Sequence, residues 1–336
     1  MRKHLDWKRV VINAMRVFIT GASGFIGSHL VEKLLNRNFY VRVLFHNRSI
    51  HREKECEIVK GDIRDLSLLE KALDSTDIIF HLAAALGASL INKKDFSQIN
   101  TEGTKNILRA AQKTGVKRIV HFSSAGVLGS VKTNETADEG YPLNPRSIYD
   151  NTKLEGERTA LNFAKNGMNI VIVRPGWTYG PGDRRTFKLI KTIAKKRFIL
   201  VTRGNAWQTP VYIDDLIEGV LLCAKRGKKG QIYHIAGNEV LTVKEITDII
   251  ALSLGNKIPP FSLPLFPVIT AVWPVEKIFY LFKRESPLSM GKLSFFIHPK
   301  PLSIQKAKQD LGYSPKVDLN TGMAQTITWY IKNKWI

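Results

Sequence analysis

Tyr149 and Lys153 are the residues whose types and spacing most clearly point to chemistry. They are four positions apart in Tyr-Asp-Asn-Thr-Lys, a spacing that puts both side chains on one face of a helix. A phenol has a pKa of about 10, but an adjacent ammonium favours the phenolate, so we expect Lys153 to lower that value. Ser123 and Ser124 end an apolar segment upstream, where a hydroxyl can hold a substrate oxygen while the tyrosine exchanges its proton. These residues predict acid/base catalysis at a hydroxyl or carbonyl group.

A glycine-rich turn near the N-terminus predicts a dinucleotide site. An apolar strand at residues 16–20 leads to glycines at 21, 24 and 27, followed by a helical pattern and a second strand at 41–45. Such a turn directs unpaired N–H groups and the positive end of a helix dipole to one point, which suits a pyrophosphate. The strand-helix-strand pattern makes a purely structural turn the weaker interpretation. The expected phosphate contacts are Gly21, Ser23, Gly24, Phe25, Ile26 and Gly27.

The end of the second strand indicates which nicotinamide cofactor is bound. An acid there usually accepts hydrogen bonds from the adenosine ribose, but Phe45 occupies that place, followed by His46 and Arg48. Because basic residues accommodate a 2′-phosphate, NADP is favoured over NAD; the alternative is that Arg48 is a solvated loop charge. After the third strand, we expect the carboxylate of Asp62 to bond the adenine amine or to cap a helix.

The first half of the chain alternates strands with helices. Strands are expected at residues 16–20, 41–45, 57–60, 78–82, 118–123 and 169–174, with a helix at 96–113 among those between them. This alternation predicts a Rossmann-type, doubly wound α/β fold with a parallel sheet. We expect residues 1–14 to be a disordered leader and 15–174, with returns near 209–240, to form the dinucleotide-binding domain. A smaller, mostly helical substrate lobe is expected at 175–208 and 241–336.

Composition limits the class of partner. The chain has 336 residues, of which 51 are Lys or Arg and 29 are Asp or Glu, giving a net charge of +22. The basic residues are scattered, without the aromatic-interleaved block of a nucleic-acid reader, so anionic small molecules or an anionic membrane surface are favoured over DNA or RNA. Cys56 and Cys223 lack metal-site spacing and fit a reducing, cytoplasmic setting, so no metal site is expected.

Taken together, these motifs resemble those of the extended short-chain dehydrogenases/reductases, the grouping of NAD(P)-dependent epimerases/dehydratases and 3β-hydroxysteroid-dehydrogenase-like enzymes. The resemblance runs from Met15 to the C-terminus and rests on residues 20–27, 61–62, 81–84, 100–104, 123–125, Tyr149 with Lys153, 174–183, 211–215 and 311–315. It implies that Tyr149 is the general acid/base, Lys153 its partner and ribose contact, and Ser124 the donor to the substrate oxygen, with Ser123 as the competing candidate. It also implies a homodimer. Further cofactor contacts are expected at Ile63, Leu82, Ala83, Ala84, Asn100, Pro175 and Gly176.

The substrate is less determined than the chemistry. Arg184, Arg185 and Arg203 fall in the expected lobe and suit phosphate oxygens, which favours an epimerase/dehydratase acting on a nucleotide-linked sugar. In many such enzymes, an Asn in the segment that follows Arg174 holds the substrate diphosphate. Here Trp177 occupies that place. Trp177 and Trp207 suit an apolar pocket instead.

Two alternatives to the nucleotide-linked sugar stay open. One is a 3β-hydroxysteroid-dehydrogenase-like or dihydroflavonol-reductase-like enzyme acting on a hydrophobic alcohol. The other is a non-catalytic NADP sensor or structural subunit, although the presence of Tyr149, Lys153 and Ser124 argues against it. The proline-rich apolar stretch at 258–275, continued to 282, is interpreted as a lid, as core, or as a peripheral membrane contact, because its prolines oppose one straight spanning helix.

Overall fold

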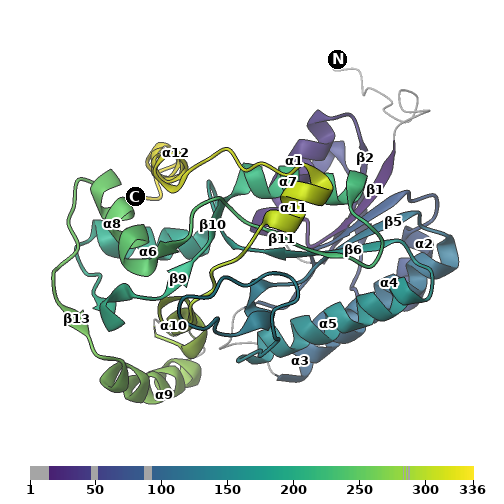
Figure 1. The fold of residues 1–336 in the computed structure, drawn as a ribbon. Helices are drawn as coiled ribbons and strands as arrows, with labels where there is room; N and C mark the ends of the chain where they lie inside the picture. The colour runs from purple at the N-terminus through teal and green to yellow at the C-terminus, as the bar shows by residue number, and fades with distance from the viewer. Residues whose placement is uncertain (1–14, 47–51, 87–92, 283, 285, 287) are drawn as a thin grey trace.

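A seven-stranded parallel sheet forms the centre of the protein, in the order β3-β2-β1-β4-β5-β6-β11 (Figure 1). The structure is a computed structural model that describes residues 15–46, 52–86, 93–282, 284, 286 and 288–336. The strands are β1 (Arg16–Thr20), β2 (Tyr40–Phe45), β3 (Glu57–Lys60), β4 (Ile78–His81), β5 (Arg118–Phe122), β6 (Ile170–Pro175) and β11 (Ile232–Ile235). This sheet, flanked by helices, confirms the doubly wound α/β fold predicted from the sequence.

Helices cover both faces of the sheet and enclose two hydrophobic cores (Figure 1). On one face lie α1 (Phe25–Asn36), α7 (Ile213–Arg226) and α11 (Gln305–Leu311); on the other lie α2 (Leu66–Ala72), α4 (Gly103–Thr114) and α5 (Ile148–Lys165). Phe18 and Ile19 are adjacent in β1 and belong to different cores, as expected from the alternation of side chains along a strand. α4 and α5, through which the family resemblance implies a homodimer, pack side by side.

The helix predicted at residues 96–113 is interrupted. α3 (Lys93–Ser97) continues into a π-helical turn, η3 (Gln98–Glu102), before α4 begins. Asn100 lies in this turn and is fully buried. A π-helical turn inserts an extra residue into the helix and re-aims the side chains around it, and such turns are frequent at functional sites. Hydrophobic periodicity does not reveal this interruption, because the residues on either side of it are helical.

The part of the chain expected to form the substrate lobe contains short strand pairs and helices. Its strands pair as β7 (Trp177–Tyr179) with β10 (Pro210–Tyr212), β9 (Trp207–Gln208) with β12 (Leu241–Thr242), and β8 (Leu200–Val201) with β13 (Ser262–Leu263). Its helices are α6 (Arg184–Ala194), α8 (Val243–Ser253), α9 (Leu265–Leu281), α10 (Met290–Ile297) and α12 (Leu319–Lys332). Of the segments expected to return to the dinucleotide-binding domain near 209–240, β10 pairs with β7, whereas β11 pairs with β6 of the main sheet. The chain returns through α7 and β11.

α9 is more continuous than its prolines suggest. Pro264 precedes the helix as its cap and Pro267 falls in the first turn, where the missing N–H would have no helical partner, so only Pro274 interrupts the interior. Val268 and Val272 are buried against Leu293 of α10. Within the described part of the chain, no helix has the length and apolar character needed to cross a membrane.

Candidate active site

The turn between β1 and α1 brings backbone N–H groups close to the end of β4. Gly21 has a φ of +77°, and a Cβ there would lie 2.8 Å from backbone atoms of Leu82 and Ala83. A Cβ on Gly27 would lie 2.2 Å from the Gly21 carbonyl oxygen. α1 begins at Gly24 without a side-chain cap, which leaves its first N–H groups without a side-chain acceptor. Other helices, by contrast, are capped by a side chain: Asp65 caps α2, Ser147 caps α5, Asp183 caps α6, Thr242 caps α8, Ser289 caps α10 and Asp318 caps α12.

A chain of hydrogen bonds ties this turn to β4 and to the π-helical turn. The Thr20 hydroxyl accepts from the Ala83 N–H at 3.1 Å and lies 2.7 Å from Nδ1 of His81, to which it donates because the neutral ring carries its proton on Nε2. Nε2 of His81 then donates to the Thr104 hydroxyl at 3.0 Å, and that hydroxyl donates to the Asn100 carbonyl at 2.7 Å. Burial lowers the pKa of His81 to about 3, so the ring is neutral and structural.

The side chain of Asn100 is occupied by protein partners. Its Oδ1 accepts from the Ala85 N–H at 2.7 Å, and its Nδ2 donates to the Thr152 hydroxyl of α5 at 3.0 Å. We therefore assign to Asn100 the positioning of the segment after β4. The cofactor contact expected from the resemblance stays a prediction. Leu82, Ala83 and Ala84, by contrast, are partly exposed in that segment.

The two serines at the end of β5 have different environments. Ser123 is buried, and its hydroxyl donates to Glu157 at 2.5 Å. Ser124 is partly exposed, caps the short 3₁₀ helix η4 (Ala125–Leu128), and accepts from the Gly126 N–H at 3.0 Å. A hydrogen bond from Ser124 to Tyr149 lowers the pKa of the phenol. Of the two candidates, Ser124 is the one available to a substrate oxygen.

Tyr149 and Lys153 lie in the first two turns of α5, which begins after the cap Ser147. Burial raises the pKa of Tyr149 to about 12, and Arg185 and the hydrogen bond from Ser124 act in the opposite direction. The pKa of Tyr149 is therefore raised where the sequence predicted a lowering, because burial outweighs the effects of Arg185 and Ser124, and Lys153 is not among the groups that shift it. Burial also lowers the pKa of Lys153 to about 8, against the opposing effect of Glu157.

Two cations interact with the start of α5: Arg185, which the sequence indicated, and Lys300, which it did not. The Arg185 guanidinium acts on Tyr149, and its Nε lies 3.3 Å from Oδ1 of Asp183, the cap of α6. Burial lowers the pKa of Lys300, the Asp150 carboxylate raises it, and Arg146 lowers it further. Lys300 was missed because it lies in an extended Pro-Lys-Pro segment without periodicity, held by the bond from its N–H to the Trp207 carbonyl at 2.7 Å.

The other two lobe arginines have different surroundings. Arg184 lies over the Trp335 ring with its Cζ 5.9 Å from the ring centroid, in the aromatic cluster at the C-terminus. Arg203 is exposed in η5 (Thr202–Gly204), with a φ of +57°. In neither case does a described contact join the arginine to Tyr149. The phosphate contacts expected from Arg184 and Arg203 therefore stay predictions, whereas Arg185 lies within electrostatic reach of the phenol.

At the end of β2, His46 is largely exposed and its Nε2 lies 3.4 Å from Oδ2 of Asp62. The Asp62 carboxylate is bound by Arg64 at 2.6 Å and 3.0 Å, and this hydrogen bonding lowers its pKa. Asp62 does not cap α2, because Asp65 does. Arg64 was not singled out from the sequence, and Arg48 lies outside the described residues.

An aromatic surface follows the end of β6. Gly176 is packed so closely that a Cβ would lie 2.5 Å from the Thr209 carbonyl oxygen. The next side chain, Trp177, is partly exposed and its ring centroid lies 4.9 Å from that of Phe295 in α10 and 5.6 Å from that of Tyr179. Trp207 is 41% exposed in the short strand β9.

These residues fit a nicotinamide dinucleotide. The uncapped N-terminus of α1 and the close approach at Gly21 suit the phosphates, with Ser23 and Gly24 exposed beside them. Lys153 is 3% exposed, and among the described residues no hydrogen bond or ion pair satisfies its ammonium. The Lys153 Nζ is not among the fully buried atoms that lack a partner, so it keeps access to solvent, and a ribose hydroxyl on that side would supply an acceptor.

Comparisons with known proteins agree with this geometry. The model of the "NAD dependent epimerase/dehydratase family" matches residues 17–236. A "3 beta-hydroxysteroid dehydrogenase/Delta 5-->4-isomerase" of Mycobacterium tuberculosis is 30% identical over 94% of this chain and 90% of its own length. A "4-hydroxy-2-methyl-3-oxo-4-farnesyl-3,4-dihydroquinoline-1-oxide ketoreductase" of Stigmatella aurantiaca is 26% identical over 92% of this chain and 95% of its own. The crystal structure of a dTDP-glucose 4,6-dehydratase from Streptomyces venezuelae with NAD bound is 28% identical, with a TM-score of 0.78 over 96% of this chain and 98% of that one.

Proposed function

The chain belongs to the NAD-dependent epimerase/dehydratase family and is an enzyme of the extended short-chain type, and from that premise we propose that it interconverts a secondary alcohol and a ketone on a hydrophobic substrate. The observation that carries this proposal is the contact between Trp177 and Phe295. It gives the lobe an aromatic surface directly after Pro175 and Gly176, the residues expected beside the nicotinamide. An indole lacks the carboxamide group with which an Asn would bond a diphosphate. Its large apolar face suits a hydrocarbon substrate instead.

The mechanism follows from Tyr149, Ser124 and Lys153. A bound nicotinamide supplies the hydride acceptor or donor. During oxidation of an alcohol, the Tyr149 phenolate takes the hydroxyl proton; during reduction of a ketone, the phenol returns it to the carbonyl oxygen. The Ser124 hydroxyl donates to that oxygen and stabilises the charge developing on it. Lys153 holds a cofactor ribose through its ammonium. With the pKa of Tyr149 raised to about 12, the phenol is protonated at neutral pH and is poised for reduction.

The relatives support a hydrophobic substrate without deciding the question. Two of those reported above are named for a steroid and for a farnesyl-bearing quinoline, both hydrophobic. The dTDP-glucose 4,6-dehydratase is named for a nucleotide-linked sugar at a similar level of identity. The Trp177 surface, which belongs to this chain, is therefore the argument for the choice.

A second candidate function is hydride chemistry on a nucleotide-linked sugar. Arg185 acts electrostatically on Tyr149, and Lys300 interacts with Asp150, the residue next to Tyr149. Cations on both of these neighbouring residues would suit an anionic substrate group. The two candidates differ in which side chains contact the substrate: Trp177 and Phe295 for the hydrocarbon, Arg185 and Lys300 for the phosphate.

Thermal shifts in the presence of NADPH distinguish the two substrates. We expect sterol-like and polyprenyl alcohols to raise the melting temperature and nucleotide sugars to leave it unchanged, because only the folded protein binds the ligand. Trp177→Asn should abolish the shift by lipid, whereas Arg185→Gln should leave it intact. Stabilisation by nucleotide sugars alone, lost in Arg185→Gln, would overturn the proposal in favour of the second candidate.

We propose NADP as the preferred cofactor, and binding of NADPH and NADH tests it. The support is the side chain of Phe45 in the place of the usual acid, and the exposed His46 beyond it. Wild-type protein should bind NADPH more tightly, and Phe45→Asp should weaken NADPH binding by about tenfold or more, since a carboxylate would face the 2′-phosphate. Phe39→Asn, a change before β2, is the control. Tighter binding of NADH by the wild type would refute the preference.

A further inference from the structure

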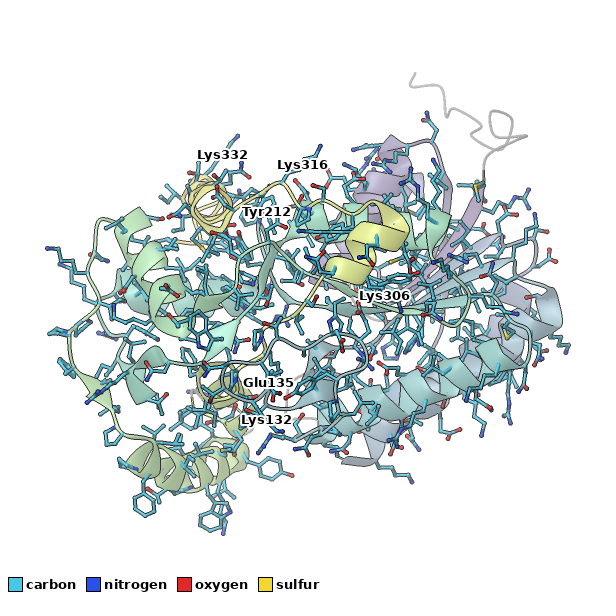
Figure 2. All side chains as sticks on the ribbon, viewed as in Figure 1. Lys132, Glu135, Tyr212, Lys306, Lys316 and Lys332 are labelled. Atoms are coloured by element: carbon cyan, nitrogen blue, oxygen red, sulfur yellow. The ribbon has the colours of Figure 1, made fainter. Side chains whose placement is uncertain are left out.

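The outer face of α9 is apolar although it is exposed. Phe266 is 79% exposed, Trp273 70% and Leu281 72%, and the helix also exposes Ile269, Ile278 and Tyr280. The inner face, with Val268 and Val272, already packs on Leu293. α9 is therefore apolar on both sides, and packing within the lobe uses only one of them. In Figure 2 the side chains of α9 project away from the body of the protein, beyond the other elements. A contiguous apolar patch of this kind is characteristic of an interaction surface.

The composition of the patch favours a lipid surface over a protein partner. Its aromatic residues include Trp and Tyr, which prefer the boundary between hydrocarbon and water. The Nζ of Lys277 lies 5.0 Å from the centroid of the Trp273 ring, so a cation accompanies the indole. Between residues 256 and 284 the sequence contains four basic residues and one acidic residue, Glu276. Apolar side chains flanked by cations match an anionic bilayer, whose headgroups attract the charge while the rings enter the acyl boundary.

The position of α9 limits the mode of binding. Its 17 residues include an internal proline, and it is not a membrane-spanning helix. One side is fixed to α10, whose Phe295 contacts Trp177. We propose that α9 docks the protein on the surface of an anionic lipid bilayer, lying in the plane of the interface with Phe266, Trp273 and Leu281 inserted. This inference goes beyond the proposed function, because docking requires neither a particular substrate nor turnover.

Flotation of the full-length protein with lipid vesicles tests the proposal. We expect the wild type to float with vesicles of phosphatidylcholine and phosphatidylglycerol, and less with phosphatidylcholine alone. Replacing two inserted rings, Phe266→Ser with Trp273→Ser, should reduce binding by about tenfold or more, since each buried aromatic side chain contributes strongly. Lys277→Glu, which leaves the apolar residues in place, should reduce binding to the anionic vesicles about fivefold or more by reversing one charge.

A matched control separates this face from general surface hydrophobicity. Leu252 of α8 is 75% exposed, so Leu252→Ser removes a comparably exposed apolar side chain outside α9 and should leave vesicle binding unchanged. NADPH binding, measured without vesicles, should be equal in all variants, which shows that they are folded. Failure of the wild type to bind, or equal binding to both kinds of vesicle, would overturn the proposal. So would lipid-free self-association that the α9 variants abolish, because the patch would then join two copies of the chain.

Discussion

Replacing Tyr149 by Phe should reduce turnover by about 10²–10⁴-fold while cofactor binding stays nearly unchanged. The substitution removes one hydroxyl and keeps the ring, so packing at the start of α5 is preserved. Without the phenol no group at that position exchanges a proton with the substrate oxygen, and Ser124, which donates to it, has no base of its own. Steady-state kinetics with a substrate from the thermal-shift panel, together with NADPH titration, provide the two measurements.

Tyr141→Phe is the matched control, because Tyr141 hydrogen-bonds Glu135 at 2.6 Å in the same domain without contact to the site. It should leave turnover within a factor of about two, because the ring that packs against the core is kept and only the hydroxyl is removed. Turnover in Tyr149→Phe close to that of the wild type would reject the assigned mechanism. Loss of cofactor binding in the same variant would instead indicate that the phenol is needed for the nucleotide.

The pH profile of the wild type adds an independent check on the same residues. Oxidation needs the phenolate of Tyr149 and the ammonium of Lys153. Since the pKa of the phenol is raised to about 12, the fraction of phenolate, and with it the oxidation rate, should rise with pH. The rate should level off near pH 8, because Lys153 then begins to lose its proton and this loss offsets the gain in phenolate. Reduction needs the phenol, which stays protonated, so its rate should be flat at lower pH and decline above about 8. An oxidation rate independent of pH from 6 to 8 would contradict these assignments.

The fold, and the elements on which the main candidate residues lie, could be predicted because they depend on local patterns. The glycine spacing at 21, 24 and 27 encodes a turn that only small residues allow, as the 2.2 Å approach at Gly27 demonstrates. Apolar runs separated by helical periodicity determine a parallel sheet. The four-residue separation of Tyr149 and Lys153 places both on α5 through helix geometry alone.

The parts that sequence reasoning missed depend on contacts between distant segments. Arg184 and Arg185 are adjacent, and only the packing of α6 against Trp335 decides that the first faces the C-terminus. The direction of the pKa shift of Tyr149 depends on the extent of burial, which spacing does not encode. Likewise, Ser123 and Ser124 are equivalent in sequence until Glu157, 34 residues from Ser123, binds one of them.

That glutamate carries the largest expected effect on stability. Glu157 and Arg174 are each 1% exposed, and their side chains meet at 2.6 Å and 2.9 Å, with Ser123 donating to the same carboxylate. Glu157→Gln keeps the shape of the side chain but leaves the Arg174 cation buried without its anion. We expect the free energy of unfolding in urea to fall by about 3–5 kcal/mol, the usual cost of breaking a buried pair from one side.

A nearby exposed glutamate on the same helix provides the control, and the pKa of Lys153 provides a second readout. Glu155 is exposed on α5, where it accepts from Thr101 at 2.8 Å, so Glu155→Gln should change stability by less than about 0.5 kcal/mol. Because Glu157 raises the pKa of Lys153, Glu157→Gln should also move the pH at which oxidation levels off below about 8.

Replacing both partners, Glu157→Met with Arg174→Met, should recover part of the lost stability, since neither charge of the pair then stays buried without the other. A loss below about 1 kcal/mol in Glu157→Gln would mean that the Arg174 cation finds another partner or water. The ion pair would then not be what holds β6 against α5.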